Sequence, residues 1–187
     1  MAHQRRFRFG AQISFAASAG DWVAKARRIE ELGFATLCVP DHFDDQLAPF
    51  PALVAAAAAT SSLRVATMVL DNDYRHPLVA AKEAATVDLL SGGRLELGMG
   101  AGWLSSDYDQ SGIVCDPPAV RIDRLEEALA VVKGLLGGGK FSFAGRHYTV
   151  TGHPGTPRPV QRPHPPILIG GGSRRILSLA GRDAITW

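Results

Sequence analysis

The sequence is short of cysteine and has no large excess of charge of one sign. It has two Cys among 187 residues, and its 20 Lys and Arg nearly balance 18 Asp and Glu. Cys38 lies in an apolar run and Cys115 beside prolines, without a CxxC spacing, which argues against a disulfide framework and a cysteine metal site. Because the basic residues are spread along the chain, neither nucleic acid nor an anionic membrane surface is expected as a partner.

Long hydrophobic runs are also missing. The first residues, MAHQRRFRFGAQISF, carry charge, but no apolar stretch of about 7–15 residues follows them. Nowhere do about 18 apolar residues stand together, as a membrane-spanning helix requires. We therefore expect a protein of the reducing cytoplasm, with enough residues to bury roughly 70% of the surface that its unfolded chain exposes.

The first hundred residues alternate between apolar strands and helices. The predicted strands are 7–15, 35–40, 63–70 and 94–100. The predicted helices are 21–33, 51–61 and 77–91. Asp21 is expected to cap the first helix and Gly33 to end it, and Pro77 fits the first turn of the third, whose expected inward stripe includes Leu89. The two middle strands are apolar throughout, which is typical of strands covered on both faces.

The spacing of these strands indicates the fold class. Strand starts near residues 8, 35, 64 and 95 are 27, 29 and 31 residues apart. A TIM-type barrel of about 250 residues has roughly 31 residues in each of its eight units. Buried strands that alternate with helices indicate an α/β protein, and we predict a TIM-type (β/α) barrel in preference to a doubly wound sheet.

The second half of the chain continues this pattern after an interruption. A loop is predicted over 101–119, followed by a clear amphipathic helix over 122–136. Residues 140–166 form a proline-rich excursion, with a hairpin and then an extended crossing. A fifth strand, 166–172, and its helix, 173–184, follow.

About five of the eight βα units of a barrel can be counted. Residues 1–187 are therefore expected to form a single barrel domain that is incomplete at its C-terminus. Five strands leave unpaired edges, so either the chain is a fragment or a partner covers the edges.

The residues that follow the second strand are the first candidates for chemistry. In α/β folds, ligands bind at the carboxyl ends of the strands. There the sequence places Asp41 and His42, and His42 could act as a general acid or base near neutral pH. The structural alternative is a loop-capping aspartate beside a surface histidine.

Glycines follow the fourth and fifth strands. Gly100, Ala101 and Gly102 could expose backbone N–H groups to an anion or a flat ring, although relief of crowding explains them equally well. Gly170, Gly171, Gly172 and Ser173 open a helix, where free N–H groups and the helix dipole favour a phosphate. Arg174 and Arg175 stand close by, and the alternative is a turn with Ser173 as a simple helix cap.

Two patterns carry no function. The segment from Gly134 to Lys140 resembles a phosphate-binding loop, but Phe141 stands in the Ser/Thr position and the segment ends a helix. His147, His153 and His164 lack HExxH or paired-cysteine spacing, so no metal site is predicted. No serine lies in a G-x-S-x-G motif either.

Five segments together resemble the bacterial luciferase-like monooxygenase superfamily. They are DWVAKARRIEELGF, VPDHF, TMVLDNDYRHPLVAAKEAATVDLLSGGRLELGMGAGW, RIDRLEEAL and PPILIGGGSRR, which span nearly the whole chain. Among its branches they are most similar to the actinobacterial oxidoreductases that use the deazaflavin coenzyme F420.

The resemblance implies a set of roles. Asp41 and His42 match the family's Asp-His pair, in which the histidine exchanges a proton beside the cofactor ring. Thr67 and Met68 match the position of a non-proline cis peptide that lies against the ring. Gly100, Ala101 and Gly102 match the family's loop after the fourth strand, and Gly171 and Gly172 match its phosphate-binding segment after the fifth. The implied reaction is hydride transfer between coenzyme F420 and a small organic substrate, in a homo-oligomer.

Departures from the family leave the substrate and the cofactor open. Sugar-phosphate dehydrogenases of the family have an acidic residue where Trp103 stands, and strands six to eight of the barrel are not found. One alternative is an FMN-dependent monooxygenase of the same superfamily. Another is a truncated, inactive remnant or interaction subunit.

Overall fold

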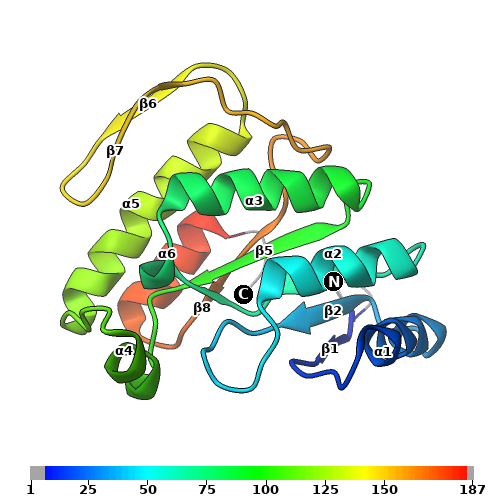
Figure 1. The fold of residues 1–187 in the computed structure, drawn as a ribbon. Coiled ribbons are helices and arrows are strands. Elements are labelled where there is room, and N and C mark those ends of the chain that lie inside the picture. Colours follow the sequence, from blue (N-terminus) through cyan, green and yellow to red (C-terminus); the bar gives the residue numbers. More distant parts are fainter. Residues whose placement is uncertain (1–6, 185–187) are drawn as a thin grey trace, which may run out of the picture.

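The computed structural model describes residues 7–184 as an open, curved sheet of parallel strands with helices packed along it (Figure 1). The strands are β1 (Gly10–Gln12), β2 (Thr36–Val39), β3 (Arg64–Thr67), β4 (Leu70–Asp71), β5 (Leu95–Gly100), β6 (Phe141–Ala144), β7 (Thr149–His153) and β8 (Ile167–Gly170). The helices are α1 (Ala19–Glu31), α2 (Pro49–Ala59), α3 (Pro77–Leu90), α4 (Ser105–Ser111), α5 (Pro118–Leu136) and α6 (Arg174–Asp183), with a short 3₁₀ turn, η1, at Asn72–Tyr74.

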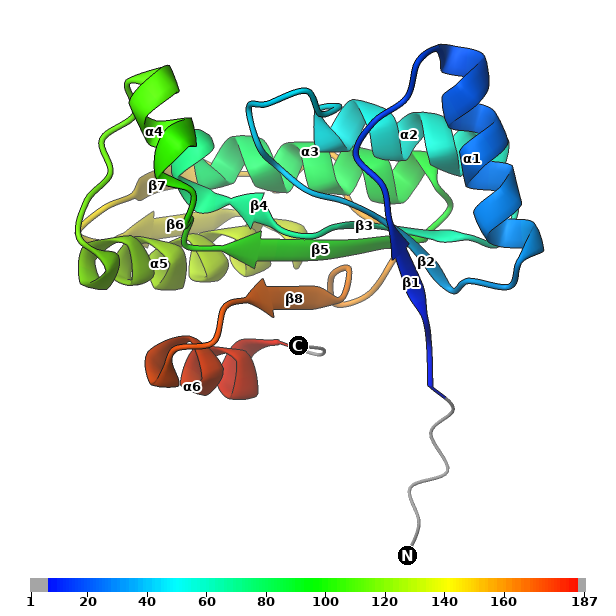
Figure 2. The same cartoon turned by 90° about the horizontal axis from the view of Figure 1, so that it is seen from below.

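The order of the strands confirms the barrel. β1, β2, β3, β5 and β8 pair side by side in the order of the chain, and every pair is parallel. A doubly wound sheet would instead reverse its strand order at one point. Figure 2 shows α1, α2 and α3 lined up along the strands, as in the outer layer of a barrel. The described residues therefore form five consecutive βα units of a TIM-type barrel, with a proline-rich excursion before the fifth strand.

Two of the predicted strands differ in detail. The strand predicted over 63–70 is interrupted, because β3 ends at Thr67 and β4 begins at Leu70, which pairs with Met99 further along β5. The interruption contains a cis peptide bond between Met68 and Val69, one residue beyond the Thr67–Met68 bond that the resemblance implied. The first strand is much shorter than the predicted 7–15, and the Phe9 side chain before it is exposed.

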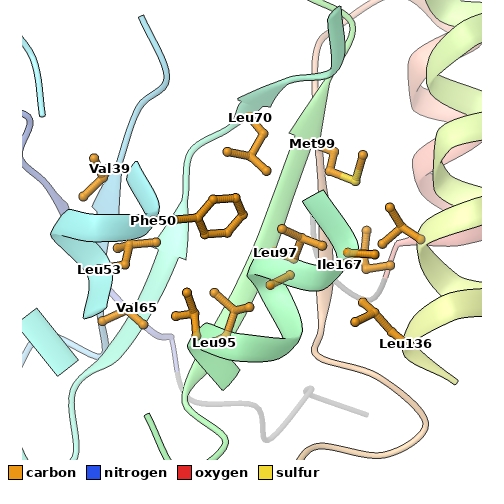
Figure 3. Close-up of a cluster of buried hydrophobic side chains, with 14 of the residues drawn as sticks. Val39, Phe50, Leu53, Val65, Leu70, Leu95, Leu97, Met99, Leu136 and Ile167 are labelled. Atoms are coloured by element: carbon orange, nitrogen blue, oxygen red, sulfur yellow. The ribbon is translucent and has the colours of Figure 1, made fainter. Parts of the chain in front are cut away.

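The core lies between the sheet and the helices α2, α3 and α5. Leu95, Leu97 and Met99 alternate along β5 and pack with Phe50 of α2 and Leu136 of α5 (Figure 3). Their neighbours on β5 face the other side of the sheet, since successive side chains of a strand alternate. There Glu96 accepts a hydrogen bond from Arg64 Nε at 2.6 Å and one from Arg8. A polar layer therefore lines the barrel side of these strands.

The helices begin and end close to where they are expected, with three corrections. The cap of α1 is Ser18, whose hydroxyl accepts the N–H of Asp21, so Asp21 lies in the first turn instead of capping the helix. Leu89 of α3 was expected to face inward but is 50% exposed, because alanines form the buried stripe. The loop predicted over 101–119 contains α4. Within residues 7–184, no helix is long and apolar enough to cross a membrane.

The excursion is a hairpin followed by an extended segment, as predicted. β6 and β7 pair antiparallel above α5, and the chain then returns to β8 (Figure 1). The returning segment is fastened to α3 by Asp88, which is fully buried. Its carboxylate accepts the backbone N–H groups of Val160 and Gln161 at 2.7 and 3.0 Å and the Gln161 side-chain amide at 2.6 Å. A buried carboxylate can thus order a segment that has few backbone partners of its own.

We expect Asp88→Ala to lower the free energy of unfolding by about 2–4 kcal/mol, because it removes three charge-assisted hydrogen bonds and leaves backbone donors without acceptors. Denaturant unfolding of the purified chain measures this change. Asp109→Ala, at an exposed position of α4, is the matched control and should change stability by less than about 0.5 kcal/mol. Equal effects of the two variants would contradict the fastening role of Asp88.

Candidate functional site

The loops at the carboxyl ends of the strands enclose a cavity of about 470 Å³. Its size falls within the usual range of ligand pockets, about 300–1,000 Å³. It is lined by Asp41, His42, Met68, Val69, Leu70, Asp71, Gly100, Ala101, Gly102, Trp103, Pro118, Arg121, Ile122, Gly170, Gly171, Gly172, Ser173 and Ile176. The cavity therefore joins the ends of β2, β3, β4, β5 and β8 with the first turns of α5 and α6.

All the site residues predicted from the sequence, except Thr67, line this one cavity. Thr67 is fully buried and does not line the cavity. The Thr67 hydroxyl lies 2.8 Å from both the backbone N and the backbone O of Gly98, so it links β3 to β5. The cavity wall beside it is formed by Met68, which is 39% exposed.

His42 is held by a buried carboxylate on α4. Its Nδ1 lies 2.7 Å from Oδ2 of Asp107, whose side chain is only 3% exposed. The same oxygen accepts the hydroxyl of Tyr74 at 2.7 Å. The His42 ring also meets Trp103 edge-on, with ring centres 5.8 Å apart. With Nδ1 occupied, Nε2 is the ring nitrogen left for a ligand in the cavity.

Asp107 keeps its negative charge in this setting. Burial acts to raise the pKa of its carboxyl, but the hydrogen bonds from His42 and Tyr74 outweigh burial and hold the pKa below its usual value. Asp107 was not predicted from the sequence, because a loop was expected there. The signal was present, since Ser105-Ser106-Asp107 is the kind of polar run that often begins a helix.

The carboxylate of Asp41 is held by hydrogen bonds from a side chain and from the backbone. Its two carboxylate oxygens accept hydrogen bonds from Arg75 at 2.6 and 3.1 Å, and Oδ2 also accepts the backbone N–H of Asp71. A carboxylate paired in this bidentate way is a strong, oriented contact. Asp41 therefore ties the loop that carries His42 to the segment after β4.

Most of the predicted glycines are required by close packing. A Cβ at Gly100 or Gly170 would come within 2.7 or 2.8 Å of the Val69 side chain. A Cβ at Gly102 would collide with the hydroxyl of Tyr108 and the carboxylate of Asp71. Relief of crowding thus explains these three positions. Gly172 differs, because this exposed residue lines the cavity and a Cβ there would meet no atom within 4 Å.

The positive charge that lines the cavity does not come from Arg175, which stands close to the glycine segment in the sequence. Arg175 turns away to Asp123 and Glu126 of α5. Arg121 of α5 lines the cavity instead, is 9% exposed, and donates to the carbonyl oxygens of Ala101 and Gly102. Among residues 7–184 no carboxylate pairs with Arg121. Its charge and the first turn of α6, which Ser173 caps, both favour an anionic ligand group.

Comparison with known proteins gives consistent results. Residues 5–187 match the family described as luciferase-like monooxygenase. An FMNH(2)-dependent dimethylsulfone monooxygenase of Pseudomonas putida is 35% identical over 128 residues, which are 68% of this chain and 35% of that protein. An uncharacterized protein of Mycobacterium tuberculosis is 32% identical over 188 aligned positions, covering 88% of this chain and 65% of that protein.

Solved structures extend the similarity to three dimensions. The monooxygenase RslO1 from Streptomyces bottropensis has a TM-score of 0.75 and 29% identity over 87% of this chain and 53% of its own. The coenzyme F420 dependent tetrahydromethanopterin reductase from Methanopyrus kandleri has a TM-score of 0.85 at 24% identity, over 95% of this chain and 54% of its own. The chain thus spans about half the length of these structures.

The match of the family to residues 5–187, the parallel strand order and the cavity at the carboxyl ends of the strands agree. This chain belongs to the luciferase-like monooxygenase family.

Proposed function

We propose that this chain binds the deazaflavin coenzyme F420 in the cavity and transfers a hydride between it and a small organic substrate. The observation that carries the proposal is the position of His42, which lines the cavity while Asp107 holds its Nδ1 at 2.7 Å and leaves Nε2 without a protein partner among the described residues. Hydride transfer to or from a carbon that bears oxygen requires a group that gives or takes a proton at that oxygen.

The residues around the cavity fit such a cofactor. The open space at Gly172, the first turn of α6 and the positive charge of Arg121 suit a phosphate-bearing tail. The cofactor ring, in contrast, needs an apolar contact surface. Three apolar side chains that line the cavity can supply it, those of Val69, Ile122 and Ile176. When bound, a deazaflavin supplies hydride chemistry at its ring carbon C5.

The protein itself supplies orientation and proton handling. A neutral His42 that donates Nδ1–H to Asp107 carries a lone pair on Nε2, so it can accept a proton from a substrate hydroxyl. The negative charge of Asp107 then stabilises the resulting imidazolium. In the reverse direction the same imidazolium gives the proton back. Asp41 takes part through position alone, since Arg75 and the Asp71 N–H occupy its carboxylate.

The second candidate is an FMN-dependent monooxygenase. The specific observation in its favour is the 35% identity to a protein described as an FMNH(2)-dependent dimethylsulfone monooxygenase. The same cavity features suit FMN, which also joins a flat ring to a phosphate. The two cofactors therefore have to be separated by experiment.

We expect the purified chain, mixed with coenzyme F420 at tens of micromolar and then desalted, to retain the absorbance of the deazaflavin. A parallel sample with FMN is the control and should lose its flavin. Retention of FMN alone would favour the monooxygenase. Retention of neither would contradict both proposals and favour a remnant or interaction subunit.

Gly172→Glu should weaken cofactor binding at least tenfold, because it places a negative side chain in the space assigned to the phosphate. Fluorescence titration with the retained cofactor measures the dissociation constant. Gly181→Glu is the matched control, since Gly181 is an exposed position of α6 with no atom within 4 Å of an added Cβ. An unchanged constant in Gly172→Glu would contradict the phosphate site.

His42→Ala should slow hydride transfer by roughly 10²–10⁴-fold and change the cofactor's dissociation constant by less than about threefold. Asp107→Asn should reduce the rate by a similar order, because an amide cannot both hold Nδ1–H and stabilise the imidazolium. Single-turnover absorbance measurements give the rates, with Asp109→Asn as the control on the exposed side of α4. Equal losses in rate and binding would make His42 a structural contact.

A further inference from the structure

Asp71 is a buried carboxyl group of the cavity that the proposed reaction does not use. It ends β4, opposite Gly100 of β5, and its side chain accepts the N–H of Asp73 at the start of η1. It is 6% exposed and is one of the residues that line the cavity. Among residues 7–184 no Lys, Arg or His forms an ion pair with it.

The phenol of Tyr108 lies between two carboxylates. Its oxygen is 3.1 Å from Oδ2 of Asp71 and 3.0 Å from Oδ2 of Asp73. A phenol has a single hydrogen, so it can donate to only one of them. Both contacts can be hydrogen bonds only when one of the two carboxyl groups carries a second hydrogen.

The surroundings decide which carboxyl group carries that hydrogen. The Asp73 side chain is fully buried but pairs with Arg124 at 2.7 Å, which stabilises its negative charge. Asp71 has no such partner in the described part of the chain. In the resulting arrangement Tyr108 donates to Asp73, and a protonated Asp71 donates to the Tyr108 oxygen, so every polar atom of the trio is satisfied.

Burial and the negative charge of Asp73 support the same assignment, and two of the nearby arginines pair with other carboxylates, Arg75 with Asp41 and Arg124 with Asp73. Burial raises the pKa of Asp71 to about 6, and the negative charge of Asp73 adds to this effect, while the hydrogen bond from the Asp73 N–H acts in the opposite direction. The titratable and charged groups that face it are Asp41 from the loop after β2, Asp73, Tyr74 and Arg75 from η1 and its end, Tyr108 from α4, and Arg121 and Arg124 from α5.

We propose that Asp71 is held as a carboxylic acid in this cavity and donates a hydrogen bond to a negatively charged acceptor atom of the bound ligand. When such a ligand binds, the hydrogen turns from the Tyr108 oxygen to the ligand atom, and Tyr108 keeps its own hydrogen bond to Asp73. Only the identity of the ligand rests on the proposed function. The cavity then has two proton-carrying groups on different strands, His42 after β2 and Asp71 at the end of β4.

The first test is a carboxyl ¹³C NMR titration of the aspartate-labelled chain between pH 4 and pH 8. The resonance that is absent from Asp71→Asn identifies Asp71. We expect it to titrate near pH 6, about two units above an ordinary aspartate. A midpoint near pH 4 would overturn the proposal.

The second test uses stability, which needs no assignment. Because the folded state binds the Asp71 proton more tightly than the unfolded state, this group lowers stability as the pH rises from about 4 to about 6. Asp71→Asn removes that component, so the melting temperature of the variant minus that of the wild type should increase over this pH range. Asp109→Asn should show a constant difference, and a constant difference in Asp71→Asn would overturn the proposal.

The third test concerns the ligand, with coenzyme F420 and FMN as probes. The dissociation constant of the wild type should rise by roughly tenfold or more between pH 5.5 and pH 8, because ionised Asp71 repels an anionic acceptor. Asp71→Asn, which keeps an N–H donor, should abolish this dependence, and Asp71→Val should bind roughly tenfold more weakly than Asp71→Asn. Equal binding by these two variants would overturn the hydrogen bond.

The two proposals fail separately. If neither cofactor binds while Asp71 titrates near pH 6, the proposed function fails and the protonated state of Asp71 stands. If a cofactor binds while Asp71 titrates near pH 4, the inference fails and the proposed function stands.

Discussion

The cavity depends on the parallel, sequential pairing of β1, β2, β3, β5 and β8. Since these strands run in one direction, their carboxyl ends lie at one edge of the sheet, and each following loop starts there. His42, Val69, Gly102 and Gly172 come from four different units of the chain, yet all line one space of about 470 Å³. The apolar side chains on the helix side of the sheet, such as Leu95 and Leu97, stabilise this pairing by burial.

Val69 shapes the cavity floor. Its side chain packs where the Cβ atoms of Gly98, Gly100 and Gly170 would be, so the two strands β5 and β8 can approach it only with glycine at these three positions. The glycines that look like a phosphate-binding signal are therefore explained in large part by packing against a neighbouring side chain. Of the glycines that line the cavity, only Gly172 opens onto free space. This distinction separates residues that build the wall from those that could touch a ligand.

The aspartates near the cavity differ in their partners. Asp41 has Arg75, Asp73 has Arg124, and Asp107 has the His42 ring, so each of these carboxylates has a partner that stabilises its charge. Among the described residues Asp71 has no cationic partner, and its pKa is raised, by burial first. Aspartates that look alike in the sequence thus have different electrostatic environments, because burial and partners differ from one position to the next.

The amino-acid sequence was enough to predict the α/β class, the barrel order and most of the helix ends. The spacing of the strands and the periodicity of apolar residues show which side chains are buried. Because the burial of apolar surface is the largest favourable contribution to folding, these patterns predict the fold class. The sequence also placed Asp41, His42 and the two glycine segments at strand ends.

The sequence could not predict the break in the strand after Thr67, the helix α4, or the partners of the site residues. His42 and Asp107 are 65 positions apart and Asp71 and Tyr108 are 37 apart, so these pairs meet only in the folded chain. Hydrogen bonds and pKa shifts depend on distance and burial, and neither leaves a periodic pattern in the sequence.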